Sequence, residues 1–167
     1  KALGIADSFN LCGALEFAEK ISKAGTQPII GTQINIFSNN QIGKITLYAT
    51  SETGYKNLTK LSSISYLKNK ESDDPYCEIK DLIENHDDLI ILTGNYNDFF
   101  GKLFYANKLK FFEKIITELK KRFENRLYIE IQRHSETLET AYENYLLQTS
   151  FSLDLPLIAG QEVFYLE

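Results

Sequence analysis

The chain has 167 residues, and 43% of them are hydrophobic, which is enough for one well-buried core and little for two. We therefore predict a single domain over 1–167. A net charge of −5 and a pI near 5.2 argue against binding of nucleic acid through bulk positive charge. No run of about 18 or more apolar residues is present, so we expect no membrane span and predict a cytoplasmic protein.

The first 31 residues are predicted to form a strand, a polar turn, a helix and a second strand. An apolar run ends at Asp7, and Asn10 has the side chain of an N-cap. Gly25 provides a helix stop, and Pro28 begins an extended segment. Asp7 would then lie at the carboxyl end of a strand, where α/β folds build their sites.

Strands and helices are predicted to alternate along the rest of the chain. We expect further strands at 44–50, 89–93, 127–131 and 157–159, and helices at 52–67, 78–84, 112–123 and 138–149, the last capped by Ser135. Residues 68–75 are predicted to be a loop. This alternation favours a parallel α/β sheet with right-handed crossovers.

Five ordered segments resemble a known domain. These are the runs 6–17 with 23–31, then 46–63, 89–94 and 128–134, and finally 155–159 with 162–166. They are similar to the PHP (polymerase and histidinol phosphatase) domain of bacterial DNA polymerase III alpha subunits. The resemblance implies an α/β fold that closes as a distorted (β/α)7-type barrel. It also implies that the first strand, with a His-x-His motif, would precede Lys1, so that the chain is a fragment of a larger polymerase subunit.

In active PHP domains, His, Asp, Glu and Cys donors from successive strand ends bind a cluster of metal ions. Measured against that pattern, Ser8 and Lys44 stand in place of His, and Gln33 stands in place of Glu. Asn95 replaces a Cys or His donor, and Phe164 replaces the second member of an Asp-x-His pair. A neutral amide does not balance metal charge, and a protonated ammonium is not a ligand.

We therefore predict a vestigial pocket without a metal cofactor, in which Lys44 takes the place of the lost cation by pairing with Asp7 or Glu162. Its candidate residues are Asp7, Ser8, Gln33, Lys44, Asn95, His134 and Glu162. Each retained donor also has a structural interpretation. His134 can be a structural histidine at a strand end, Asp7 a turn or capping residue, and His86 part of a solvated loop.

Two segments are candidates for binding a partner. The first is aromatic and contains Tyr96, Phe99, Phe100, Phe104 and Tyr105, which could be core packing or an exposed contact surface. The second is the basic stretch 108–126, which is interrupted by glutamates and could equally be a solvated helix face.

The resemblance favours a non-catalytic PHP domain of a replicative DNA polymerase III alpha subunit, a DNA-directed DNA polymerase and nucleotidyltransferase. Such a domain would support the other domains of the polymerase and help dock the proofreading exonuclease subunit, with DNA contacted only indirectly. The alternative is a metal-dependent phosphoesterase or 3′–5′ exonuclease that works with fewer Zn, Mn or Fe ions. A third hypothesis is a free-standing PHP-like protein unrelated to replication. The donor count favours the first.

Overall fold

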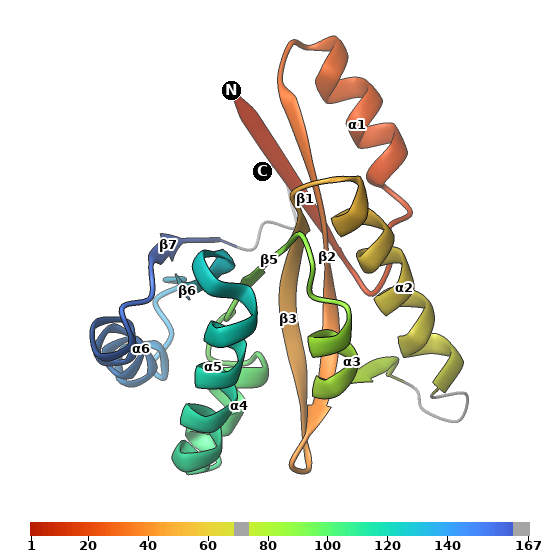
Figure 1. Ribbon diagram of the computed structural model, residues 1–167. Helices are drawn as coiled ribbons and strands as arrows, with labels where there is room; N and C mark the ends of the chain where they lie inside the picture. Colours follow the sequence, from red (N-terminus) through yellow and green to blue (C-terminus); the bar gives the residue numbers. More distant parts are fainter. Residues whose placement is uncertain (69–73, 162–167) are drawn as a thin grey trace.

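The structure is a computed structural model that describes residues 1–68 and 74–161 (Figure 1). Its elements in chain order are β1 (Ala2–Ser8), α1 (Ala14–Lys23), β2 (Gln27–Ser38), β3 (Gln41–Ala49), α2 (Glu52–Lys68), β4 (Tyr76–Glu78), α3 (Ile79–Glu84), β5 (Leu89–Leu92), α4 (Phe99–Tyr105), α5 (Leu109–Phe123), a 3-10 turn η1 (Glu124–Arg126), β6 (Leu127–Ile131), α6 (Glu139–Leu153) and β7 (Leu157–Ala159). Within these ranges no helix combines the length and apolar character that a membrane crossing needs.

The strands form one mixed sheet in the order β1-β2-β3-β5-β6-β7, with β4 paired to the far part of β2. The pairs β1–β2, β5–β6 and β6–β7 are parallel, as predicted. The expectation of an all-parallel sheet was wrong, because β3 is antiparallel to both β2 and β5. The two-residue turn at Asn39 and Asn40, both with positive φ, can join only antiparallel strands.

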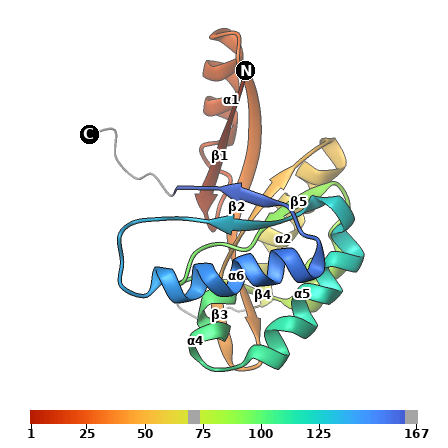
Figure 2. The same ribbon diagram turned by 90° about the vertical axis from the view of Figure 1, so that its left-hand side faces the viewer.

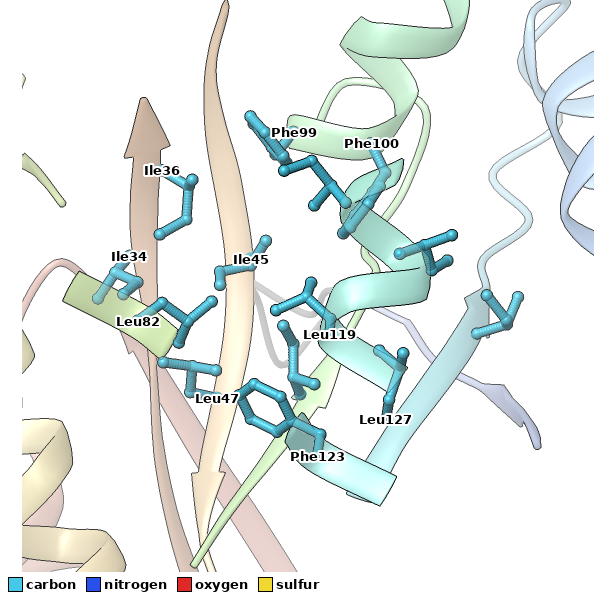
Figure 3. Close-up of a cluster of buried hydrophobic side chains, with 14 of the residues drawn as sticks. Ile34, Ile36, Ile45, Leu47, Leu82, Phe99, Phe100, Leu119, Phe123 and Leu127 are labelled. Carbon is cyan, nitrogen blue, oxygen red and sulfur yellow. The ribbon is translucent and has the colours of Figure 1, made fainter. Parts of the chain in front are cut away.

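The sheet curls into a half barrel, in agreement with the predicted distorted barrel (Figures 1 and 2). One face of its central strands carries the core. Figure 3 shows Leu82 of α3, with Leu119 and Phe123 of α5, gathered against the strand residues Ile45 and Leu47. All five side chains are almost completely buried. Side chains alternate along a strand, so the opposite face of β2 and β3 carries Gln33, Asn35, Lys44 and Thr46.

Several local predictions need correction. Helix α1 begins at Ala14 rather than after Asn10, because the Asn10 side chain is engaged in the preceding turn, where its Oδ1 accepts from the Cys12 N–H at 2.9 Å. Helix α6 begins at Glu139, and Ser135, with φ of 66°, does not cap it. The aromatic segment contains α4, a short helix that was not predicted.

Candidate functional site

The candidate residues come from the ends of neighbouring strands. The register pairs Ser8 of β1 with Gln33 of β2, Gln33 with Thr46 of β3, and Thr46 with Leu92 of β5. Asn95 and His134 follow β5 and β6 by a few residues. We call the side of the sheet opposite the core in β1, β2, β3 and β6 the polar face.

Ser8, Gln33 and Lys44 form a hydrogen-bonded group on the polar face. The Ser8 hydroxyl donates to Gln33 Oε1 at 2.7 Å, and Lys44 Nζ donates to the same oxygen at 3.1 Å. All three side chains are half-buried. The predicted pairing of Lys44 with Asp7 is not formed in the structure, where the Asp7 carboxylate instead accepts a hydrogen bond from the Gly13 N–H. Glu162, the other predicted partner, lies outside the described residues.

Asp7 lies on the opposite side of β1 from Ser8, as alternation requires. Its Oδ2 accepts a hydrogen bond from the Gly13 N–H, at the start of α1, at 3.1 Å. The Thr32 hydroxyl donates to the backbone oxygens of Asp7 and Asn10 at 2.8 and 2.9 Å, which holds the turn together. Asp7 is therefore a turn and helix-capping residue in this structure, the structural alternative considered from the sequence.

A second polar group lies around the ends of β5 and β6, and Gln132 is its centre. Gln132 Nε2 donates to Glu130 Oε1 at 2.9 Å. Gln132 Oε1 accepts from Asn95 Nδ2 at 3.3 Å and lies 3.2 Å from His134 Nε2. Asn95 and His134 were predicted from the sequence as site residues, whereas Gln132 and Glu130 were not. The alternation of 130, 132 and 134 after the apolar strand was the signal that could have found them.

Glu130 is the buried carboxylate of this group, with 6% of its surface exposed. A Cβ at Gly160, just after β7, would come within 1.9 Å of Glu130 Oε1, so a larger residue there would force this carboxylate to move. Glu130 also influences Tyr48 of β3, whose pKa is raised by burial first and by this carboxylate second. Tyr48 in turn covers Gly31, where an added Cβ would meet its ring at 2.5 Å. The polar face thus has a cationic part near Lys44 and an acidic part near Glu130.

The loop that carries His134 is fixed by Glu139, a buried residue in the first turn of α6. Its carboxylate accepts from the N–H groups of His134 at 2.8 Å and Glu136 at 3.1 Å. The His134 side chain itself is exposed. The prediction of a solvated loop around His86 needs correction, because that ring is half-buried and packs against Phe123, with centroids 5.7 Å apart.

The donors in the described residues do not fit a metal cluster. Within 1–68 and 74–161 no three His, Cys, Asp or Glu side chains converge in the way that a metal ion requires. Asp7 is held by the turn before α1, whereas Glu130 and His134 lie in the group around Gln132. Lys44 adds a positive charge to the polar face.

Most of the aromatic segment lies in the core. Phe99 and Phe100 are completely buried, and Phe104 packs beside Tyr142 and Tyr145 with centroids 5.6 and 5.1 Å away. Their burial removes Phe99 and Phe100 from the predicted partner surface. Tyr96 and Phe104 are partly buried against the core, which leaves Tyr105 as the member with substantial exposure, at 41%.

A sequence model of the PHP domain matches residues 1–134. The chain belongs to the PHP domain family. This confirms the family predicted from the five ordered segments. Among solved structures, this PHP domain is similar to a protein from Bifidobacterium adolescentis assigned as a metal-dependent phosphoesterase, with a TM-score of 0.58 and 11% identity. The match covers 95% of this chain and 76% of that one, and at such low identity it shows the fold alone.

Curated relatives of this PHP domain are named DNA polymerase III subunit alpha. The protein from Caulobacter vibrioides is 34% identical over 172 residues, which is 98% of this chain and 15% of that protein. The protein from Rickettsia bellii is 36% identical over 165 residues, which is 98% of this chain and 14% of that protein. The chain therefore spans about a seventh of the length of these relatives.

Proposed function

We propose that this PHP domain is a non-catalytic part of a DNA polymerase III alpha subunit, where it supports the polymerase and docks the proofreading exonuclease subunit during DNA replication. The names of the curated relatives support the polymerase context. The inactivity is inferred from the polar face, and the exonuclease partner from the resemblance of the sequence to polymerase PHP domains.

The observation that carries the proposal is the group formed by Ser8, Gln33 and Lys44. One amide oxygen accepts from both the hydroxyl and the ammonium, at 2.7 and 3.1 Å. An ammonium already supplies a positive charge at this position, and a divalent ion beside it would be repelled by that charge. The group supports a pocket stabilised by internal hydrogen bonds rather than by bound metal.

Metal analysis and activity assays test this proposal together. We expect purified protein, incubated with Zn, Mn or Fe ions and then desalted, to hold substoichiometric metal. It should hydrolyse neither a phosphomonoester nor the 3′ end of labelled DNA. Stoichiometric metal, with activity lost in Glu130→Gln and His134→Ala but kept in the surface control Lys56→Ala, would instead support a metal-dependent phosphoesterase or exonuclease with a reduced site.

Docking of the exonuclease is proposed to use surface outside the polar face, with Tyr105 as the aromatic candidate. Truncation of an aromatic anchor typically weakens binding by about 1 kcal/mol or more, or roughly fivefold in Kd. We expect Tyr105→Ala in the full alpha subunit to weaken binding of its proofreading subunit by this amount, whereas Tyr66→Ala on α2, at a residue of similar exposure, should not. Equal affinities for both variants would remove Tyr105 from the docking surface.

A further inference from the structure

Helix α6 exposes an uncharged face to solvent. Its charged residues are Glu139, which is buried, and Glu143, which pairs with Arg133 at 2.6 Å. The ten residues from 144 to 153 carry no charge at all. In Figure 2 the helix lies at the front of the molecule with no other element over it.

Large apolar side chains project from this face. Leu147 and Phe151 are one helical turn apart and are 40% and 91% exposed. The other exposed residues of the helix are small or neutral and polar, namely Thr140, Ala141, Asn144, Gln148 and Ser152. We call these residues, together with Leu147 and Phe151, the α6 face. A helix that lacks a charged outer side is typical of a position covered by other protein.

Helix α5 of the same domain shows what a solvated face looks like here. Its exposed side carries Lys110, Glu113, Lys114, Lys121 and Arg122, and its apolar residues point inward. Both helices are 15 residues long and both bury one side in the same core. We therefore attribute the charged outer side of α5 and the uncharged outer side of α6 to different surroundings.

The chemistry of the α6 face selects one kind of occupant. A separate protein that binds by diffusion gains association rate and orientation from charge, and such contacts are enriched in arginine. The α6 face contains neither a charged residue nor an arginine. A segment tethered to the domain needs no such steering, because its effective concentration is already high, and permanent interfaces are the more apolar ones. The relatives of this domain are about seven times as long as this chain, so tethered polypeptide is abundant in them.

We propose that the α6 face is a permanent docking surface for another domain of the same polypeptide, with Phe151 and Leu147 as its anchors. This rests on the proposed function in one respect, that the chain is one domain of a longer polymerase subunit. It adds a location and a chemistry for the contact: an apolar, uncharged patch of the tethered domain seated on α6, with both anchors in the C-terminal half of the helix.

Site-specific photo-crosslinking in the full-length polypeptide tests the proposal. A benzophenone amino acid is placed at position 151, and in a control protein at Leu15, which is 73% exposed on α1. We expect the probe at 151 to crosslink to a peptide of the same polypeptide outside 1–167. The yield should stay unchanged on roughly tenfold dilution, because the contact is intramolecular. The probe at 15 should give mainly solvent-quenched product.

Other outcomes would overturn the proposal. A crosslinked species of doubled mass that disappears on dilution would indicate a second copy, and a crosslink that needs added exonuclease would indicate a separate partner. Quenching at 151 equal to that at 15 would indicate an open surface. Hydroxyl-radical footprinting of the unmodified protein gives a second readout, in which Phe151 should be oxidised at least about fivefold more slowly than Tyr66 after correction for intrinsic reactivity.

The two proposals can fail separately. If the full-length polypeptide contains no polymerase region, the proposed function fails. If it contains one, binds no metal, and still leaves Phe151 open to solvent, only the assignment of the α6 face fails.

Discussion

The carboxylate of Asp7 accepts a hydrogen bond from the Gly13 N–H, 3.1 Å away, and so joins the end of β1 to the start of α1. A negative charge at this position also complements the positive end of the helix. Asp7→Ala should lower the free energy of unfolding by about 1 kcal/mol, measured by urea denaturation. Asp7→Asn, which keeps an acceptor oxygen, should lose less.

The exposed carboxylate Asp87 supplies the control for this effect, since Asp87→Ala makes the same change in net charge. That variant should unfold at nearly the wild-type urea concentration. If Asp7→Ala left stability unchanged but removed bound metal, the capping role assigned to Asp7 would be incorrect.

Converting Gln33 to a carboxylate should strengthen its group on the polar face. Ser8 and Lys44 both donate to Gln33 Oε1, and charge-assisted hydrogen bonds are stronger than neutral ones. We expect Gln33→Glu to add roughly 0.5–1 kcal/mol to stability at pH 7. Lys44 favours the ionised carboxyl in the folded state, so the gain should be lost as the pH falls through the range in which the carboxyl becomes protonated. A gain that persists in a Lys44→Met background would show that it does not come from this pair.

The hydroxyl of Tyr142 is buried, and no described residue forms a hydrogen bond with it. Removing this hydroxyl breaks no described hydrogen bond of the folded state. Tyr142→Phe should therefore leave the free energy of unfolding unchanged or raise it by up to about 1 kcal/mol. Burial, followed by the carboxylates of Asp98 and Glu130, raises the pKa of Tyr142 well above its usual value.

A raised phenol pKa also predicts a pH dependence. The contribution of Tyr142 to stability is complete below the pKa of the unfolded chain, near 10, and is lost as the pH rises further. Tyr142→Phe should therefore flatten the decline of Tm above pH 10, while Tyr66→Phe, at an exposed site, should not. A larger destabilisation by Tyr142→Phe than by Tyr66→Phe at pH 7 would indicate a hydrogen-bond partner for the buried hydroxyl.

The two thiols should react at very different rates. Cys12 is exposed, whereas Cys77 is completely buried and its Sγ lies 3.2 Å from the Leu61 carbonyl oxygen, to which it donates. Burial raises the pKa of the Cys77 thiol to about 12, with Asp81 adding to the shift and Lys68 opposing it. In Cys12→Ser protein, a disulfide reagent should modify Cys77 only as fast as the protein opens.

The same thiol makes stability fall in alkali. Since its folded pKa exceeds its unfolded value, its contribution is lost as the pH rises from about 9 toward 12. Cys77→Ala should reduce this slope. Rapid modification of Cys77 under native conditions would contradict its placement in the core.

Most elements and their order were predicted from the sequence. Their segments have clear apolar periodicity, and Gly, Pro and polar residues mark where they end. The sequence did not predict the direction of β3, which follows from the turn at Asn39 and Asn40. A turn of two residues with positive φ leaves no room for a crossover, so the strand it starts must run backward. The direction of β3 is therefore determined by the length of the turn and not by the composition of the strand.

The candidate site was predicted in part. Ser8, Gln33 and Lys44 were identified one by one, but their shared acceptor is a consequence of strand register, which the sequence alone does not give. Asp7 was grouped with them because it lies at the carboxyl end of a strand, although its side chain points to the opposite face from that of Ser8. For Phe99 and Phe100 the sequence left core packing and an exposed surface as alternatives, and tertiary packing places both in the core.

Strands β5 and β6 join the part of the sheet formed by β1, β2, β3 and β5 to the part formed by β6 and β7, and few residues pair between them. In the described sheet, β5 and β6 pair through Ile91 with Leu127 and Leu92 with Tyr128, whereas β2 and β3 pair along eight positions. Backbone amide hydrogens exchange with solvent when a cooperative unit of the structure opens. Such units separate where the contacts between them are fewest. The segment of β6, α6 and β7 is therefore expected to open as one unit while the β2–β3 hairpin stays closed. The domain would then have two separate exchange rates for its amide hydrogens, divided at the seam between Leu92 and Leu127.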